Sequence, residues 1–121
     1  MQTLTEPAPG KLSSISMEDF FLLHESGKTL LFDARPSLIY RMGHIPGAIN
    51  LPKSRCDERI AVRGAQIRGA LAAGKTIVVY CTGITCPDAH TVAMRLSSSG
   101  HPASVFSGGW DSWKEAGMPV E

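Results

Sequence analysis

The stretch TIVVYCTGITCPD, residues 76–88, joins an apolar run to a short polar loop with a cysteine at each end. A continuous apolar run that ends at Tyr80 is typical of a buried strand in a parallel sheet. Pro87 suits the first position of a helix, where its missing N–H leaves no bond unmade. The stretch therefore predicts a strand, a tight turn over residues 81–86, and a helix.

The rest of the chain continues this alternation of strands and helices. Further strands are expected at 29–35, 48–50 and 103–106. Helical patterns or capping residues indicate helices at 17–25, 36–40, 56–73, 87–99 and within 108–117, although Gly64 weakens the third of these. Such alternation predicts an α/β domain with a mostly parallel sheet.

Length and composition point to one ordinary globular domain. The chain has 121 residues, of which 43% are hydrophobic and 19% charged, and its net charge is +1. This balance gives no reason to expect nucleic acid or a membrane as partner. We expect an extended lead-in at 1–11 and a single domain over 12–121.

Targeting signals and cysteine usage favour a cytoplasmic location. The first ten residues lack the basic and apolar regions of a signal peptide, and no apolar run approaches the roughly 20 residues of a membrane span. Three cysteines are too few for a disulfide scaffold. In a reducing compartment, a cysteine is kept for its reactivity or for packing.

Cys81 follows the predicted strand at 76–80 and so lies at the carboxyl end of that strand, where ligands bind in α/β proteins. If residues 82–86 curl around its sulfur, their N–H groups form an anion-binding nest, and the following helix adds its positive end. Both effects favour the thiolate. On the loop alone, a small buried cysteine at a strand end is an equally good interpretation.

Two long segments resemble the rhodanese-like domain. FDARPSLIYRMGHIPGAINLP, residues 32–52, resembles its entry motif. IVVYCTGITCPDAHTVAMRLSSSGHPASVFSGGWDSWKEAGMPV, residues 77–120, resembles its active-site strand, loop and helix and its C-terminal glycine-glycine-tryptophan block. The resemblance, over residues 12–120, implies one α/β domain with helices on both faces of a central parallel sheet.

The resemblance also implies a sulfurtransferase. Cys81 would take a sulfane sulfur from thiosulfate or a persulfide, hold it as a persulfide, and pass it to a thiol, to a cyanide-like acceptor or to a protein partner. The loop that would cradle this sulfur comprises Thr82, Gly83, Ile84, Thr85 and Cys86. Phosphatase relatives carry an arginine six residues after the cysteine, and Pro87 stands there. No metal or other cofactor is implied.

Asp33 and Arg35 match the family's aspartate-x-arginine and would support the loop. A buried Asp33 would accept loop N–H bonds and Arg35 would pair with an acid, which favours a structural polar network over direct chemistry. His44 is expected to be packed and hydrogen-bonded in its turn rather than to act as a base. Trp110 and Trp113, at helical spacing, are expected in the core.

The loop departs from the family pattern in two ways. It contains no lysine or arginine, which should weaken the binding of thiosulfate. Its last position is Cys86, for which three interpretations stay open: a small residue at the helix start, a resolving thiol for Cys81, or, least supported, a metal ligand. The alternatives to sulfur transfer are a dithiol redox protein that uses Cys81 and Cys86, and a non-catalytic interaction module.

Overall fold

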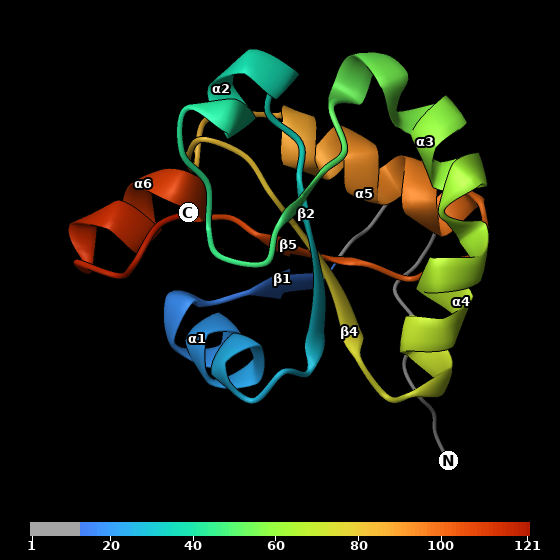
Figure 1. Cartoon of the computed structure of the whole chain (residues 1–121), viewed down its shortest axis with the longest axis horizontal. Coiled ribbons are helices and arrows are strands. Elements are labelled where there is room, and N and C mark those ends of the chain that lie inside the picture. Colours follow the sequence, from blue (N-terminus) through green and yellow to red (C-terminus); the bar gives the residue numbers. More distant parts are fainter. Residues whose placement is uncertain (1–12) are drawn as a thin grey trace.

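The computed structural model describes residues 13–121, which form one five-stranded sheet flanked by helices (Figure 1). The lead-in predicted at 1–11 lies outside the described residues. The strands are β1 (Ser13–Ile15), β2 (Thr29–Asp33), β3 (Ile49–Asn50), β4 (Thr76–Tyr80) and β5 (Ser104–Phe106). The helices are α1 (Met17–Glu25), α2 (Ser37–Arg41), α3 (Cys56–Val62), α4 (Gly64–Ala72), α5 (Asp88–Ser98) and α6 (Gly109–Glu115), with a 3-10 turn η1 (Lys53–Arg55) before α3.

All neighbouring strands run parallel, in the order β1-β5-β4-β2-β3. The central strand β4 pairs with β2 along its whole length, from Thr76 opposite Thr29 to Tyr80 opposite Asp33. The predicted α/β class with a parallel sheet is confirmed. Strand β1 was not predicted, because Ser13–Ile15 has no apolar run of its own and is a strand only through its pairing with β5.

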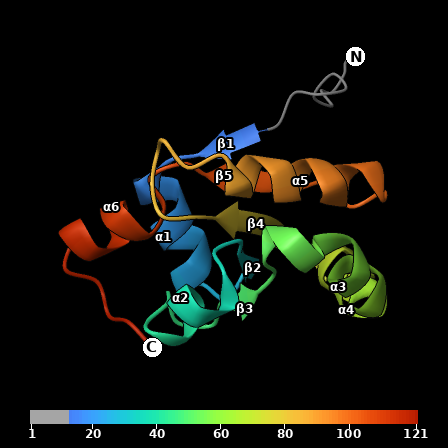
Figure 2. The same ribbon diagram turned by 90° about the horizontal axis from the view of Figure 1, so that it is seen from above.

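The helices cover both faces of the sheet, as expected. Figure 2 shows α1 and α6 on one side of the strands and α3, α4 and α5 on the other. Helix α1 begins where predicted, because the Ser16 hydroxyl accepts a hydrogen bond from the Asp19 N–H at 3.1 Å. Each face of the sheet therefore has its own hydrophobic core.

Alternation along β4 divides its side chains between the two cores. Ile77, Val79 and Cys81 belong to the core under α3, α4 and α5, whereas Val78 and Tyr80 belong to the core under α1 and α6. Successive residues of a strand point to opposite faces. This period of two places the Cys81 side chain on the α5 side of the sheet.

Two predicted elements end differently in the structure. The helix expected at 56–73 is two helices, because Arg63 leaves the helical conformation and both ends α3 and precedes α4. The strand expected at 29–35 ends at Asp33, because the Arg35 N–H turns back to the Asp33 carboxylate at 2.9 Å. Gly64, which weakened the helix prediction, lies at the break.

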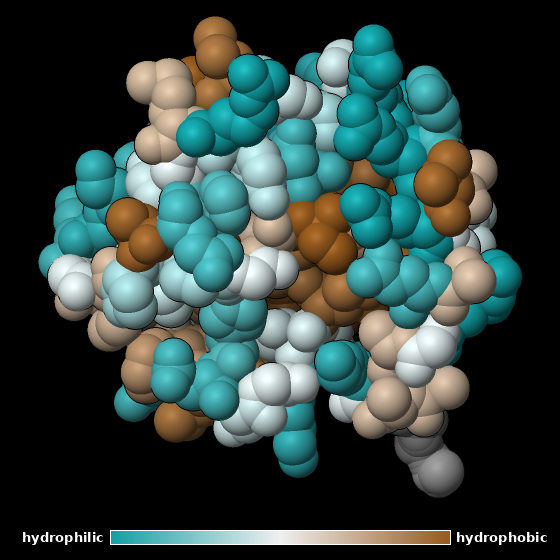
Figure 3. Space-filling model, viewed as in Figure 1, coloured by the Kyte–Doolittle hydropathy of each residue, from teal (hydrophilic) through white to brown (hydrophobic). Residues whose placement is uncertain are grey.

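The surface is mostly hydrophilic on the face shown in Figure 3, and its hydrophobic residues form small groups. Several large apolar side chains are exposed, among them Leu38, Met42, Val62 and Ile84. None of the helices formed by residues 13–121 combines the length and the apolar character needed to cross a bilayer.

Candidate active site

Cys81 lies at the carboxyl end of the central strand and is bonded to Cys86. The two sulfurs form a disulfide, and the two Cα atoms are 6.2 Å apart. Cys81 is only 3% exposed and packs with Ala89 and Val92 of α5. Its position is the one where α/β folds bind ligands.

The loop between the two cysteines presents free backbone N–H groups. Within residues 13–121, the N–H groups of Thr82, Gly83, Ile84 and Thr85 donate to no backbone carbonyl. The Cys86 N–H instead closes a turn by donating to the Gly83 carbonyl at 3.0 Å. Four of the five amides of the predicted cradle are thus available to an anion, and that of Cys86 is not.

Helix α6 fixes the loop from the other side. The Trp110 N–H donates to the Cys81 carbonyl at 2.9 Å, and the Asp111 N–H donates to the Thr82 carbonyl at 2.8 Å. Gly109 permits this approach, since it has φ +57° and an added Cβ would lie 2.4 Å from the Cys81 oxygen. The sequence predicted a helix here but gave no signal that its first amides bind the loop.

Asp33, Arg35 and Tyr80 form a buried polar network beneath the loop. The Arg35 guanidinium donates to Asp33 Oδ2 at 2.7 Å and to the Gly43 carbonyl at 2.7 Å. The Tyr80 hydroxyl donates to Asp33 Oδ2 at 2.6 Å and accepts from the Ile45 N–H at 3.1 Å. Arg35 also lies 4.6 Å from the centre of the Trp110 ring. The network therefore links β2, β4 and α6.

This network corrects one prediction and confirms another. Asp33 was expected to accept N–H bonds from the active loop, and this is wrong, because its oxygens are occupied by Arg35 and Tyr80. Arg35 was expected to pair with an acid, and that acid is Asp33. Burial lowers the pKa of Arg35, but the hydrogen bonds and charge of Asp33 outweigh it and hold this pKa above its ordinary value.

A charged pair that was not predicted from the sequence lies beside the sulfurs. Lys53 Nζ is 3.7 Å from an Asp88 carboxylate oxygen. One Asp88 oxygen and the sulfurs of Cys81 and Cys86 lie within 4.8 Å of one another. These three residues could hold a metal ion only after reduction, because a disulfide offers no thiolate ligand. Lys53 follows β3, which is distant in sequence, so no local pattern connected it to the loop.

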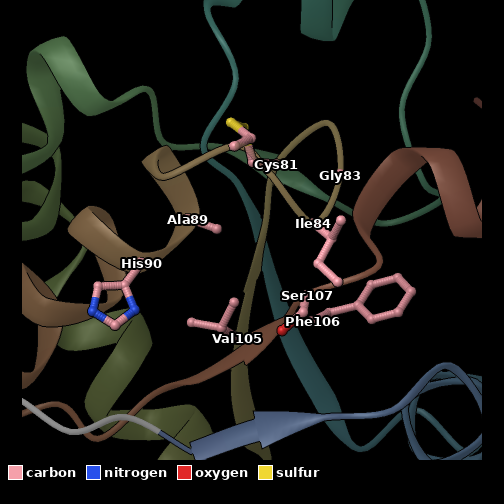
Figure 4. A pocket seen from close by; sticks show the side chains of 9 residues that line it. Cys81, Gly83, Ile84, Ala89, His90, Val105, Phe106 and Ser107 are labelled. Atoms are coloured by element: carbon pink, nitrogen blue, oxygen red, sulfur yellow. A yellow bond between two sulfur atoms is a disulfide. The ribbon is translucent and has the colours of Figure 1, made fainter.

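A pocket of about 140 Å³ is lined by the loop, by the start of α5 and by the end of β5, including Cys81, Cys86, His90, Val105 and Ser107. In Figure 4 the sulfur of Cys81 points away from His90, Val105 and Ser107. The pocket therefore adjoins both cysteines, although the Cys81 side chain does not point toward His90. Ile84, at the tip of the loop, is 83% exposed.

His44 and the two tryptophans lie largely as expected. The His44 ring stacks on Tyr40 at 3.9 Å and its Nδ1 donates to the Tyr40 carbonyl at 3.0 Å. Trp113 is buried in the core, whereas Trp110 is half-buried and covers Arg35. Cys56, the remaining cysteine, is a free buried thiol whose pKa is raised by burial.

The arrangement suits nucleophilic sulfur chemistry. The loop after Cys81 carries amides that donate to no backbone carbonyl and leads into the first turn of an 11-residue helix, and both features favour a thiolate close to them. The second cysteine lies within bonding distance of the first. Together they can carry out nucleophilic attack on a sulfur atom and disulfide formation.

Comparison with known proteins agrees with this geometry. The sequence profile of the family described as "Rhodanese-like domain" matches residues 16–116. An HTH-type transcriptional regulator of Mycobacterium tuberculosis is 33% identical over 108 residues, which are 89% of this chain and 44% of the relative. A Synechococcus elongatus protein named "Putative thiosulfate sulfurtransferase" is 30% identical over 74% of this chain and 32% of its own length. The chain thus spans less than half the length of both curated relatives.

Solved structures share the fold. A rhodanese-related protein from Thermoplasma volcanium superposes with a TM-score of 0.69 and 25% identity, over 90% of this chain and 97% of that protein.

Proposed function

Because the chain belongs to the rhodanese-like domain family, we propose that it is a sulfurtransferase that carries a sulfane sulfur on Cys81. In the first half-reaction, the Cys81 thiolate attacks the sulfane sulfur of a donor and becomes a persulfide. In the second, a thiophilic acceptor removes the outer sulfur and restores the thiolate. The acceptor is a thiol, a cyanide-like anion or a partner protein.

The free amides of residues 82–85 carry this proposal. No side chain of residues 82–86 is cationic, so the loop can stabilise negative charge only through hydrogen-bond donors, of which these amides are held in place by the backbone. Backbone N–H groups that converge on an anion stabilise it without any movement of the site. The same amides that favour a Cys81 thiolate would receive the outer sulfur of a persulfide.

The donor is proposed to be a persulfide rather than thiosulfate. Thiosulfate is a dianion, and Lys53 is already paired with Asp88, whose carboxylate lies beside the sulfurs. Asp88 itself places a carboxylate beside both sulfurs. A donor with less negative charge meets less repulsion there.

The disulfide supports a second candidate function. Cys81 and Cys86 could serve as a redox pair that responds to an oxidant, with no sulfane sulfur involved. The two functions differ in what the reduced protein gains. Sulfur transfer adds one sulfur atom to Cys81, whereas the redox function only removes two hydrogens.

Intact mass spectrometry distinguishes these candidates. Reduced protein is incubated separately with thiosulfate, with a low-molecular-weight persulfide and with hydrogen peroxide. We expect the Cys86→Ser variant to gain one sulfur atom at Cys81 from the persulfide, and Cys81→Ser to gain none. Cys56→Ser is the matched control, because that buried thiol lies outside the loop. Absence of any gain in Cys86→Ser, together with peroxide-driven disulfide formation in the wild type, would favour the redox function.

A further inference from the structure

We infer that Cys86 is a resolving thiol that reduces the Cys81 persulfide and releases its outer sulfur as hydrosulfide. The chain would then act as a persulfide reductase, with an external dithiol as the final electron donor. This inference rests on the proposed function, because it needs a sulfur atom on Cys81. It adds a catalytic residue, a product and a class of partner.

The step balances in atoms and electrons. The Cys86 thiolate attacks the inner sulfur of the Cys81 persulfide, so that a Cys81–Cys86 bond forms and the bond to the outer sulfur breaks. The outer sulfur leaves with the electron pair as hydrosulfide and is reduced, the Cys86 sulfur is oxidised, and the Cys81 sulfur keeps its oxidation state because it exchanges one sulfur–sulfur bond for another. A dithiol then reduces this disulfide to two thiols and becomes a disulfide itself.

The backbone already holds the two sulfurs at the distance that this step requires. Cys86 returns toward Cys81 through the turn that its own N–H closes with the Gly83 carbonyl. The start of the loop is fixed by the α6 amides on the carbonyls of Cys81 and Thr82. The Cα separation of 6.2 Å lies within the usual range for disulfides. The attack of Cys86 on the Cys81 persulfide therefore needs no rearrangement of the fold. Because the two residues are held close together, the Cys86 thiol has a large effective concentration at Cys81.

Charges at the site suit attack by Cys86. The residue stands just before α5, whose positive end favours a thiolate at this place. The Asp88 carboxylate lies within 4.8 Å of the sulfur and can accept the thiol proton. Lys53 holds that carboxylate at 3.7 Å and offsets its charge.

Exposure of the two cysteines suits reduction by a partner. Cys81 is 3% exposed in the disulfide form, whereas Cys86 is partly exposed. An incoming thiol therefore reaches the Cys86 sulfur, and Cys81 is the leaving group. The amides of residues 82–85 stabilise Cys81 as it leaves, so the thiolate needed for the next cycle is regenerated in its cradle.

The test follows one labelled sulfur atom. Reduced wild type, Cys86→Ser, Cys81→Ser and Cys56→Ser are each mixed with a low-molecular-weight persulfide labelled isotopically at its outer sulfur. Intact mass, peptide mapping and labelled sulfide are then measured over time. Cys86→Ala is a second variant at the same position, and circular dichroism checks that every variant is folded.

We expect the wild type and Cys56→Ser to release the label as sulfide and to form the Cys81–Cys86 disulfide. Cys86→Ser and Cys86→Ala should keep the labelled persulfide on Cys81 at least about tenfold longer. Adding a dithiol should return the wild type to its reduced mass and allow a second round of release.

Each contrary outcome has its own meaning. A wild-type persulfide that lasts as long as that of Cys86→Ser, with no disulfide, would overturn the role of Cys86 and leave the sulfurtransferase intact. Cys86→Ser that acquires the donor's organic group in place of the label would overturn it as well, because the sulfide would then come directly from the donor. No labelled sulfur on Cys81 in any variant would overturn the proposed function and this inference together.

Discussion

The negative charge of Asp88 affects both the binding of a sulfur donor and the reactivity of the two cysteines. Its carboxylate lies within 4.8 Å of both sulfurs and pairs with Lys53. A negative charge at this distance raises the cost of a thiolate and repels an anionic donor. The same carboxylate is available to take the proton of Cys86. Asp88 therefore opposes the binding of an anionic donor and supports the attack of Cys86 on the Cys81 persulfide.

Replacing Asp88 by asparagine should improve the use of thiosulfate. Removal of the carboxylate frees Lys53 and lowers the repulsion of the dianion, so we expect kcat/KM for thiosulfate to rise roughly threefold to tenfold. The measurement is sulfur transfer from thiosulfate to cyanide. A persulfide donor, which carries less negative charge than thiosulfate, should show a smaller change.

Asp57→Asn is the matched control for Asp88→Asn. Asp57 pairs with Arg95, which lies seven residues further along α5 than Asp88, or roughly 10 Å along the helix axis. We expect its removal to leave the kinetics with thiosulfate unchanged. An equal gain in both variants, or a loss in Asp88→Asn, would show that the Asp88 carboxylate does not repel thiosulfate.

At the scale of elements, the loop depends on the first turn of α6 as much as on β4 and α5. Two α6 amides donate to the carbonyls of Cys81 and Thr82, so the backbone at the start of the loop is held by α6. Asp111 also approaches the loop, since a Cβ on Gly83 would lie 2.7 Å from its carboxylate. The glycine-glycine-tryptophan block thus serves the site through its backbone.

Gly109→Ala should disturb the loop more than an ordinary glycine substitution. Gly109 and Gly117 both have positive φ, but only at Gly109 would the new methyl group meet the Cys81 backbone. We expect Gly117→Ala to lower the free energy of unfolding by about 1 kcal/mol and Gly109→Ala by about 2–4 kcal/mol. Urea unfolding measures both values.

Persulfide loading tests whether the strain at Gly109 reaches the site. Gly109→Ala should load sulfur on Cys81 at least about tenfold more slowly, because the amides that receive the sulfur are displaced. Gly117→Ala should load at the wild-type rate. Equal loading by the two variants would show that the contact between α6 and the loop is not needed for the chemistry.

At the scale of the whole molecule, Tyr80 joins three segments that are far apart in the sequence. It stands on β4, donates to Asp33 on β2 and accepts from Ile45 in the turn before β3. Burial raises the pKa of Tyr80 above its ordinary value, and the negative charge of Asp33 raises it further. The folded protein therefore keeps this proton at a pH where the unfolded chain loses it.

Stability should fall as the pH rises above about 10, the ordinary pKa of tyrosine. The unfolded chain then binds fewer protons than the folded one, so each such tyrosine lowers the free energy of unfolding by up to about 1.4 kcal/mol per pH unit. Tyr80→Phe should be less stable than the wild type at neutral pH by about 1–3 kcal/mol. As the pH rises above about 10, its free energy of unfolding should fall less steeply than that of the wild type. Urea unfolding at about pH 8 and about pH 11 measures both effects.

Tyr40→Phe is the matched control for this pH dependence. Burial raises the pKa of Tyr40 as well, but Tyr40 is only half-buried, and its hydroxyl donates one hydrogen bond, to the Ala48 carbonyl at 2.6 Å. Removing the Tyr40 hydroxyl should change the pH dependence of the free energy of unfolding less than removing the Tyr80 hydroxyl. Tyr80→Phe with the wild-type slope would show that Tyr80 ionises in the folded protein as readily as in the unfolded chain.

The sequence by itself determined the order of the main elements and the position of Cys81. The apolar run at 76–80, the capping residue Ser16 and the proline at 87 act over a few residues, so their effects could be predicted without knowledge of the fold. It also limited Cys86 to three roles. It could not choose among them, because C-x4-C spacing alone does not fix the distance between two sulfurs.

Only the tertiary structure decided which groups meet around Cys81 and Cys86. The Cys81–Cys86 disulfide depends on the turn between them, and the pairing of Lys53 with Asp88 depends on how β3 and β4 lie in one sheet. The strand β1 and the amides of α6 likewise act through partners distant in the sequence. No pattern among neighbouring residues predicts such contacts, because they form between segments that come together only when the chain folds.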